Sequence, residues 1–551
     1  TLTDCRIWSS EATRLPRTSC YQTSLPSFAE SAHPQYDVRM MLRGPQALLL
    51  TAWLCLLPRL SSAESIPTPA KALSLAQTDN VQRLALRSLA EWQAPGIAIA
   101  MVHNGSVVLL QAYGNRRVGD AARVDVHTRF ALASLTKTLT AATAVMLAEE
   151  GKLSLNRPIK ESLPDFVLQD PVATAQLTLL DILSHRSGIS ESADLLWTGT
   201  GFDRKEVLRR LKDVPQESLV RSRFAYSNVM YTLAGELIAK AGGASWESLL
   251  HQKVFIPAKL SDAGIGIPSA PDGNTASPHT IRNETLTAIA PRVLHNIAPA
   301  AGVYASISDL ANLLKIFTSD GYLDGKQVFS KTLIDAMMTP QTLVGLAPWA
   351  KALYPQSHFL AHGLGLMLQD HRGRLVAWNT GGIDGFSCSL AMIPDEKLGI
   401  AVLTNVPWTG LPESLIFALL DDWLGSTGKD WIATRLQMSK SSRARQAAAV
   451  QAQLGAGPSP QPEISASQLV GTYVSALLGE AELRQDGSEF SVRIAKSLTG
   501  RLSPWQKSRL RMQFDDPALG VVPCDLQLSP DGKVVSFTLG DHGKFVRTSA
   551  K

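Results

Sequence analysis

The sequence is poor in cysteine, and the few that it has form no recognisable framework. Five occur among 551 residues, and only Cys388 and Cys524 lie beyond residue 63. We place these two in different domains, and their spacing fits neither a zinc site nor the dense pairing of small disulfide-stapled proteins. The cysteines therefore indicate neither a metal site nor a set of disulfides.

Concentrated positive charge is also missing. The formal net charge is +5 at pH 7, which is small for this length, and no segment gathers Lys and Arg into a run. A nucleic-acid partner is therefore not expected, because such a partner calls for a basic patch or stripe. The chain is 45% hydrophobic and 18% charged, so it can form a large core divided over two or more domains.

The N-terminal region has no long apolar run. Its apolar run, residues 47–57, is short. This run follows a short basic start at Met40 and precedes a small-x-small pattern that ends at Ala63. Such an arrangement is typical of a signal peptide, and the run is too short for a retained membrane span. We expect residues 40–63 to direct export, to the periplasm or the medium. Residues 1–39 are expected to lie outside the native protein.

Strand patterns stand at both ends of the following region, with helical sequence between them. Residues 95–114 are two apolar runs around Asn104-Gly105, a dipeptide typical of a hairpin turn. Helical and irregular sequence follows over residues 134–317, and strand-like runs return between residues 374 and 404. This order predicts one sheet, assembled from both ends of the region and packed on helices.

The first domain would span residues 64–435, and a second domain follows it. Residues 436–463 have a Pro, Gly, Ala and Gln composition that is typical of a linker. Residues 464–551 contain short alternating runs broken by Asp-Gly pairs at 486–487 and 531–532. This pattern predicts a small antiparallel β-domain, either a sandwich or a barrel.

The stretch from Phe130 to Gly151 places a serine and a lysine three residues apart at the head of an apolar helix. Ser134 and Lys137 would share one helix face. A serine hydroxyl needs a base to act as a nucleophile, and a neutral lysine amine can serve. Lowering a lysine pKa from about 10.4 to near 7 takes about 4 kcal/mol, and apolar surroundings act in that direction. The pattern alone is weak, because it recurs at Ser426 and also fits a helix cap beside a solvated lysine.

Two further motifs favour the catalytic interpretation. Tyr226 and Asn228 stand just before an amphipathic helix, where the hydroxyl can relay a proton and the amide can orient a substrate carbonyl or the lysine. The third motif is WNTGGIDGF, residues 378–386, a strand whose small residues let a substrate approach and whose glycine N–H can complete an oxyanion hole. No G-x-S-x-G occurs, which argues against an α/β-hydrolase.

These three motifs, in this order, make the chain resemble the serine β-lactamase-like and penicillin-binding-protein superfamily. That group includes class C β-lactamases, D-amino-acid peptidases and related esterases, and the resemblance covers roughly residues 75–425. It implies an α+β fold, with an antiparallel sheet flanked by helices and an all-helical subdomain. The tail resembles the small antiparallel β-barrel domain that often follows such hydrolases. The resemblance implies no metal and no cofactor.

The resemblance also implies residue roles. Ser134 would be the acylated nucleophile, Lys137 its base, and Tyr226 the group that protonates the leaving group and later activates water. The N–H groups of Ser134 and Gly382 would form the oxyanion hole. The substrate-binding residues would be Asn228, Trp378, Asn379, Thr380, Gly381 and Gly382.

The third motif departs from the family pattern. Where the family usually has Lys or His, this chain has Asn379, which can donate only a neutral hydrogen bond. Binding of a substrate carboxylate at this place is therefore in doubt. Trp378 would either line an apolar subsite or be a buried strand residue. Among other candidates, His185 is interpreted as structural, His362 as bordering the cleft and Cys388 as a core residue.

Together these expectations favour an exported serine hydrolase that cleaves amide bonds, a peptidase acting on linear or D-residue-containing peptides. The missing cation, the chain length and the second domain favour a peptidase over a β-lactamase. Within the family, the chain resembles the peptidase that opens linearised microcystin. A β-lactamase, a carboxylesterase and a penicillin-binding sensor that is acylated without turnover are the alternatives. The expected partner is a small peptide, amide or ester, and the sequence leaves the oligomeric state open.

The second S-x-x-K pattern provides a control for the nucleophile assignment. We expect Ser134→Ala and Lys137→Ala each to abolish turnover, because one removes the nucleophile and the other its base. Ser426→Ala should leave turnover unchanged. Hydrolysis rates of the three purified variants check this, and full activity in Ser134→Ala would remove the assignment.

Overall fold

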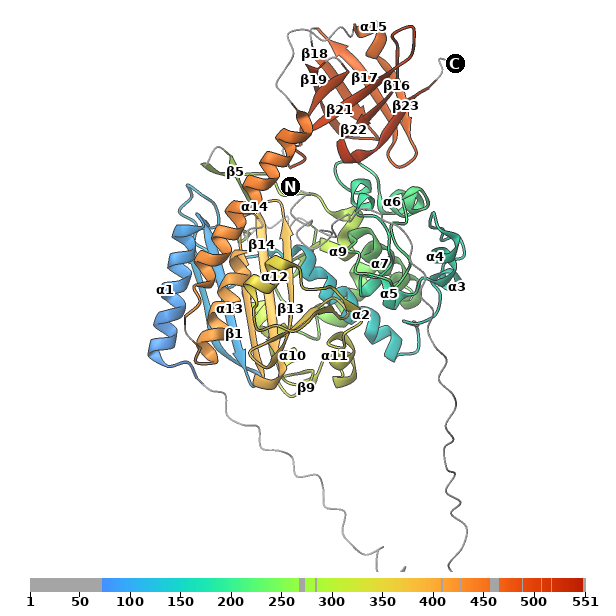
Figure 1. The fold of residues 1–551 in the computed structure, drawn as a ribbon. Helices are drawn as coiled ribbons and strands as arrows, with labels where there is room; N and C mark the ends of the chain where they lie inside the picture. Colours follow the sequence, from blue (N-terminus) through green and yellow to red (C-terminus); the bar gives the residue numbers. More distant parts are fainter. Residues whose placement is uncertain are drawn as a thin grey trace, which may run out of the picture. The chain divides into compact units, whose positions relative to one another are not determined.

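The computed structural model describes residues 72–548, except 267–272, 283–284, 408–409, 427, 456–464, 488, 507 and 517. The predicted upstream segment and signal peptide lie outside the described residues. Figure 1 shows a sheet with helices on both faces, a group of helices beside it, and a closed β-barrel, which confirms the predicted fold class. No described helix is both long and apolar enough to cross a bilayer.

The large sheet joins the two ends of the first domain, as the strand patterns predicted. Its order is β10-β11-β12-β13-β14-β15-β1-β2, and β1 pairs antiparallel with β15, with Ile97 opposite Thr404. The hairpin of β1 and β2 turns at Asn104 and Gly105, whose positive φ angles are those that a tight Asn-Gly turn requires. The bounds are β1 Gly96–His103, β2 Ser106–Gly114, β10 Thr342–Leu343, β11 Leu360–His362, β12 Met367–His371, β13 Arg374–Ile383, β14 Phe386–Ile393 and β15 Leu398–Thr404.

Alternate residues of this sheet enter two different cores. On β1, Ala98 and Ala100 belong to the core shared with the helical group, while Ile97 and Ile99 belong to the core on the opposite face. The opposite face is covered by α1 (Leu75–Glu91) and α13 (Leu411–Trp423). Because both faces are buried, the central strands are apolar almost throughout, and alternation alone does not reveal which residues face which core.

The helical group carries the first two motifs. Its centre is α2 (Thr136–Glu149), which packs against α7 (Asn228–Gly242) and is buried along most of its length. The other helices before β11 are α3 Ile159–Ser162, α4 Pro171–Gln176, α5 Leu179–Leu183, α6 Arg204–Arg209, α8 Trp246–Leu250, α9 Ala298–Ala301, α10 Ile307–Thr318, α11 Lys331–Met337 and α12 Pro348–Leu353. Short strands connect them: β3 Phe130–Ala131, β4 Gly264–Ile265, β5 His279–Arg282, β6 Thr285–Ala288, β7 Val303–Ala305, β8 Tyr322–Leu323 and β9 Lys326–Gln327.

The C-terminal region forms a closed antiparallel barrel with its own core, which decides between the predicted sandwich and barrel. The core contains large side chains such as Tyr473, Phe514 and Phe537. A short helix, α15 (Ala466–Leu469), precedes the barrel. The strands are β16 Gly471–Ser475, β17 Gly479–Asp486, β18 Glu489–Ile494, β19 Leu498–Gln506, β20 Arg509–Phe514, β21 Val521–Leu528, β22 Val534–Leu539 and β23 Lys544–Arg547.

The predicted linker at 436–463 is largely helical. Most of it is the second part of a long helix, α14 (Trp431–Leu454), which ends at Gly455 with a φ of 77°. Ala, Gln, Arg and Met are strong helix formers, so the composition that was interpreted as a linker supports an exposed helix. The prolines of this segment begin only at Pro458, among residues that are not described.

Candidate active site

Ser134 and Lys137 lie at the entrance to α2, as the spacing predicted. A single turn of 3-10 helix, η2 (Ala133–Leu135), carries Ser134 and leads directly into α2. Ala133 has a φ of 44°, a left-handed conformation that is strained for a residue with a side chain and that turns the chain just before the serine. Lys137 Nζ lies 2.9 Å from Ser134 Oγ.

Three oxygen atoms enclose the Lys137 amine, and the residue is only 2% exposed. Besides Ser134 Oγ, the amine contacts Asn228 Oδ1 at 2.7 Å and the Ala300 carbonyl at 3.0 Å. The last two oxygens can only accept hydrogen bonds, so two positions on the nitrogen carry hydrogens. The third position faces the serine. A neutral amine would therefore direct its lone pair at the serine hydroxyl, as a general base requires.

Tyr226 reaches the same serine from the segment before α7. Its hydroxyl oxygen lies 2.7 Å from Ser134 Oγ, and its ring centroid lies 4.9 Å from Lys137 Nζ. Ser227 caps α7 with its side chain, so the backbone is extended at Ser227 and becomes helical at Asn228. The structure thus brings together the serine, the lysine, the tyrosine and the first amide predicted from the sequence.

Asn379 faces Ser134 from β13, but its side chain is engaged within the protein. Its Nδ2 donates to the Ser134 carbonyl at 3.2 Å, to Thr138 Oγ1 at 3.0 Å and to the Gly365 carbonyl at 3.1 Å. Its Oδ1 accepts the Thr380 N–H at 2.8 Å. The side chain therefore ties the sheet to the start of α2. Its role as a substrate ligand, like that of Thr380, stays a prediction.

The predicted apolar subsite at Trp378 is wrong. Successive residues of a strand point to opposite faces of the sheet, so Trp378 points away from the side on which Asn379 meets the serine. Trp378 is 2% exposed and packs in the core beneath α1 and α13, with Val376 and Met367. The alternative interpretation, a buried strand residue, is correct.

Gly381 lets β13 lie directly against the segment that precedes the nucleophile. A Cβ at this position would come within 2.1 Å of the Leu132 carbonyl oxygen and 2.7 Å of Cys388 Sγ. The Cys388 thiol is buried and donates to the same carbonyl at 3.0 Å. Burial holds its pKa well above the usual range, as fits a core residue. Gly382 and Ser134 both line the cavity described below.

Two buried histidines pack behind Tyr226. The ring centroid of His185 lies 4.4 Å from that of Tyr226 and 4.9 Å from that of His362. His185 Nδ1 accepts the Ser227 N–H at 3.2 Å. Burial is the main cause that lowers the pKa of His185 well below its usual range and that of His362 to about 4. Both imidazoles are therefore neutral at pH 7, and His362 lies in this buried group rather than at the cleft edge.

Sequence reasoning missed one residue of this network, Asp194. It lies in the 3-10 segment η3 (Glu191–Leu196), and its Oδ2 accepts a hydrogen bond from Asn228 Nδ2 at 2.8 Å. The two residues are 34 positions apart, and no spacing rule connects them. The available signal was an aspartate within the apolar stretch ADLLW, which is costly to bury unless it has a partner.

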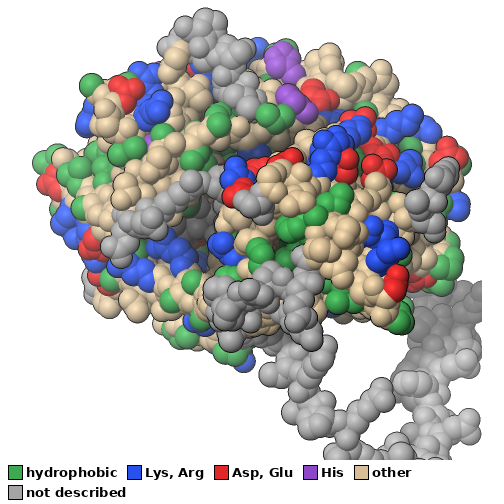
Figure 2. All heavy atoms as spheres, turned by 90° about the horizontal axis from the view of Figure 1, so that it is seen from above, with side chains coloured by type: hydrophobic (Ala, Val, Ile, Leu, Met, Phe, Trp, Pro, Cys, Tyr) green, Lys and Arg blue, Asp and Glu red, His purple; other side chains and the backbone are tan. Residues whose placement is uncertain are grey.

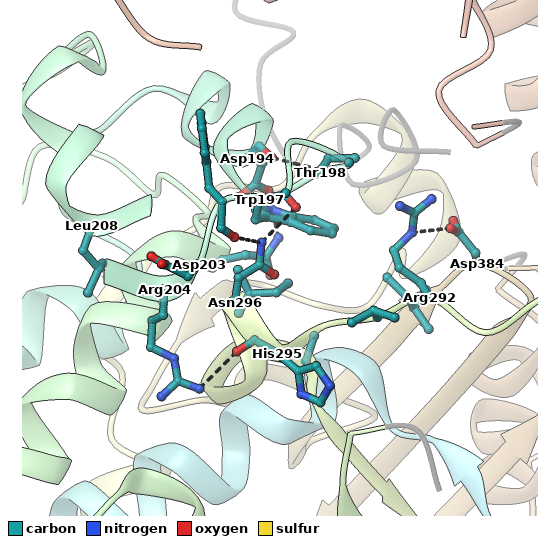
Figure 3. Close-up of a pocket in the computed structure, with 18 of the residues that line it drawn as sticks. Asp194, Trp197, Thr198, Asp203, Arg204, Leu208, Arg292, His295, Asn296 and Asp384 are labelled. Atoms are coloured by element: carbon teal, nitrogen blue, oxygen red, sulfur yellow. Dashed lines mark hydrogen bonds and ion pairs between the residues drawn. The ribbon is translucent and has the colours of Figure 1, made fainter. Parts of the chain in front are cut away.

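A cavity of about 1670 Å³ opens at Ser134. Ligand pockets for small molecules typically measure about 300–1,000 Å³. One wall is formed by η3 and α6, another by the segment around Arg292, and the barrel contributes Ser497, Asp516 and Ala518. Figure 3 shows Asp194 and Trp197 on one side of the space, and Arg292 with Asp384 on the other.

The two arginines labelled in Figure 3 are each neutralised by acidic partners. Arg292 pairs with Asp384 at 2.5 Å and with Asp516 of the barrel at 2.9 Å. Arg204 pairs with two glutamates, the closer of which, Glu247, is at 2.6 Å. Neither guanidinium therefore offers unpaired charge to a substrate anion. The face in Figure 2 is mixed in the same way, with basic and acidic side chains interspersed.

The arrangement contains the groups that acyl transfer needs. A hydroxyl, an amine and a phenol meet at one point, which can supply a nucleophile, a base and a proton relay. Among the described residues, no group of three or more His, Cys, Asp or Glu side chains is placed to hold a metal ion.

Comparison with known proteins agrees with this geometry. The family model described as Beta-lactamase matches residues 81–413, more than half of the chain. The chain belongs to the beta-lactamase family. It is similar to the unguisins hydrolase ungD of Aspergillus violaceofuscus, 28% identical over 74% of this chain and 76% of that protein. It is also similar to the D-alanyl-D-alanine-carboxypeptidase/endopeptidase AmpH of Escherichia coli, 25% identical over 66% and 92%. Like these hydrolases of the family, the chain is a serine hydrolase.

Solved structures share the fold. The octameric penicillin-binding protein homologue from Pyrococcus abyssi matches with a TM-score of 0.55 at 20% identity, over 85% of this chain and 100% of that one. A D-stereospecific amidohydrolase from Streptomyces matches with a TM-score of 0.53 at 21% identity, over 64% and 100%. A class C beta lactamase from Rhodobacter sphaeroides matches at 0.52 and 20%, over 63% and 99%. At these identities the likeness concerns the fold alone.

The close approach at Gly381 leads to a prediction. Gly381→Ala should lower kcat by at least about tenfold and the stability by about 1–3 kcal/mol, because the new methyl group must push β13 away from the turn that carries Ser134. Gly264→Ala is the matched control, since a Cβ there meets no atom within 4 Å. Kinetics and thermal unfolding of both variants check this. A wild-type kcat in Gly381→Ala would contradict it.

The neutral histidines predict acid lability. Folding lowers the pKa of His362 to about 4, below the value of about 6.5 in an unfolded chain. The free energy of unfolding therefore has its full value above pH 6.5. It falls by about 3 kcal/mol as the pH falls toward 4. Urea unfolding between pH 7 and 4 should show a smaller loss in His362→Asn, which cannot titrate. Parallel losses in both proteins would contradict the prediction.

Proposed function

We propose that the protein is an exported serine peptidase that works through an acyl-enzyme on Ser134. The observation that carries the proposal is the approach of two groups to one serine oxygen, Lys137 Nζ at 2.9 Å and the Tyr226 hydroxyl at 2.7 Å. Ser134 is the nucleophile, Lys137 the base and Tyr226 the proton relay. The proposal of export rests on the signal pattern of the N-terminal sequence.

In acylation, Ser134 Oγ attacks the carbonyl carbon of the scissile amide while its proton passes to the neutral Lys137 amine. The N–H groups of Ser134 and Gly382 hold the oxyanion. The intermediate collapses when the leaving nitrogen takes a proton from the Tyr226 hydroxyl, which recovers one from Lys137. The C–N bond breaks, and the carbonyl carbon remains on Ser134 as an ester.

In deacylation, a water molecule attacks that ester. Its proton passes to Tyr226 while Tyr226 passes its own proton to the neutral Lys137 amine, and Ser134 leaves with the proton that Lys137 then returns. Turnover depends on this step. A penicillin-binding sensor would stop at the ester, so the rate of deacylation separates the two functions.

Several observations support a peptide over a small lactam. The cavity is larger than a small molecule needs, and the third motif has a neutral amide whose polar atoms are engaged by the protein. The paired arginines of the wall likewise offer no unpaired cation. Two similar proteins are named as an unguisins hydrolase and a carboxypeptidase/endopeptidase. We propose linear or D-residue-containing peptides as substrates, with linearised microcystin as a candidate.

The test is a product analysis with the full chain and its Ser134→Ala variant. The panel contains linear peptides with L or D residues, each with a free or an amidated C-terminus, a chromogenic cephalosporin and a short-chain aryl ester. Cleavage is measured by mass spectrometry, together with the mass of the intact protein. We expect Ser134-dependent cleavage of peptides, with kcat/KM values for free and amidated termini within about threefold, because Asn379 supplies no cation at the third motif to hold the carboxylate.

Other outcomes separate the alternatives. Cephalosporin or ester turnover without peptide cleavage would replace the proposal by a β-lactamase or a carboxylesterase. One lasting equivalent of acyl group without turnover would indicate a sensor. A strong preference for free C-termini would contradict the argument from Asn379 while leaving the mechanism in place.

A further inference from the structure

We infer that Asp194 is a positioning residue for the serine chemistry: its carboxylate fixes the orientation of the Asn228 amide and thereby the place of the Lys137 amine. This inference rests on the proposed function, in which Lys137 is the base. It concerns a residue outside the three motifs. The path consists of two hydrogen bonds, from Asn228 Nδ2 to Asp194 at 2.8 Å and from Lys137 Nζ to Asn228 Oδ1 at 2.7 Å.

An amide side chain can be turned in two ways, and only one of them suits the lysine. With the oxygen toward Lys137, Asn228 accepts a hydrogen bond from the amine. With the NH2 group toward Lys137, two sets of donors would face each other. An ionised carboxylate only accepts hydrogen bonds, so Asp194 requires the NH2 group on its own side. The oxygen is then held toward the amine, whose remaining position faces Ser134.

The surroundings of Asp194 strengthen the preference for this orientation of the Asn228 amide. Its Oδ1 is buried and has no well-formed hydrogen bond among the described residues, so the bond from Asn228 is its principal partner. Burial raises the pKa of the Asp194 carboxyl, against the hydrogen bond from Asn228, the neighbouring Trp197 and the charge of Lys137. Loss of the hydrogen bond from Asn228 would leave a buried carboxylate without its principal donor, which is costly. This cost favours the observed contact between Asp194 and Asn228.

The segment that carries Asp194 is itself fixed in place. Within it, the Thr198 hydroxyl donates to the Asp194 carbonyl at 3.0 Å (Figure 3). Next to it, the Thr200 carbonyl accepts the backbone N–H of Lys496 at 3.0 Å, and the Gly199 carbonyl accepts Ser497 Oγ at 2.8 Å. These two partners belong to a loop of the barrel. A carboxylate on a segment that is held on its C-terminal side by these contacts can act as a fixed reference for the amide.

The inference predicts a change in the pH profile as well as in the rate. A negative charge near Lys137 favours its ammonium form, so removal of that charge lets the amine lose its proton at lower pH. The titratable groups around the amine are Asp194, Tyr226, Tyr231, His185 and His362. Burial lowers the pKa of both imidazoles, so they are neutral at pH 7, and it raises the pKa of the Tyr231 hydroxyl. The acid limb of kcat/KM therefore reports the lysine and its carboxylate.

The experiment compares Asp194→Ala, Asp194→Asn and Asp79→Asn in the full chain. Asp79 is an exposed aspartate of α1, outside the residues that line the cavity, so it is the matched control. We measure kcat, KM, the pH profile, the rate of Ser134 acylation by an aryl ester, and thermal unfolding. Asp194→Ala should lower kcat and the acylation rate about ten- to a hundredfold with KM within about twofold.

The asparagine variant gives the decisive readout. Asp194→Asn keeps an oxygen that can accept from Asn228, so it should retain most of the rate at the optimum. Its acid limb should move to lower pH by about one unit, because the charge is gone. Asp79→Asn should change neither quantity. A carboxylate that only supported η3 would alter the unfolding temperature without moving this limb.

Each outcome decides the inference. An unmoved acid limb in Asp194→Asn, or an unchanged kcat in a folded Asp194→Ala, overturns it. If Asp194→Ala does not fold, the asparagine variant decides alone. If the aryl ester acylates the wild-type protein at a residue other than Ser134, the proposed function itself fails, and that result is distinct from a normal acylation in which Asp194 has no influence.

Discussion

A lysine amine that is surrounded by protein oxygen atoms instead of water is the constraint on which the first domain depends. Removing such a group from water is costly unless every donor finds an acceptor. Here the polar partners of the amine come from three separate segments: the turn before α2, the start of α7, and the Ala300 carbonyl in α9. The amine keeps these contacts only while the three segments hold their relative positions. The packing of α2 against α7 and the hydrogen bond from Asn379 to the Ser134 carbonyl both help to fix these positions.

The features that could be predicted from the sequence are those that local chemistry determines. The Asn104-Gly105 turn, the three-residue step from Ser134 to Lys137 and the cap before Asn228 each depend on a few neighbouring residues. Trp378 could not be placed, because both faces of its sheet are buried and the strand carries no polar side. The partner of Asn228 could not be found either, since Asp194 lies in a separate 3-10 segment without a pattern. The helix α14 could not be predicted either, because the residue types that form it are also common in linkers.

The barrel contacts the segments that form the walls of the cavity. Leu195 packs against the barrel core, the carbonyls of Gly199 and Thr200 bond to a barrel loop, and Asp516 shares Arg292 with Asp384. Asp384 follows the strand of the third motif directly, and Leu195 is next to Asp194. Two walls of the cavity are therefore in contact with the second domain. Differences in such a domain would change which substrates fit without touching the serine, the lysine or the tyrosine.

The pairing of β1 with β15 has a consequence for the order of events during synthesis. The Gly96 N–H is satisfied by Asn405 Oδ1, 309 residues further along the chain, and the strand of the third motif lies in the same late part of the sequence. Contacts between such distant residues form slowly, because a long loop must close before they stabilise anything. The serine and lysine are thus translated early but gain their surroundings late. In a nascent chain the surroundings of the nucleophile therefore stay incomplete until the central strands β13, β14 and β15 have been translated.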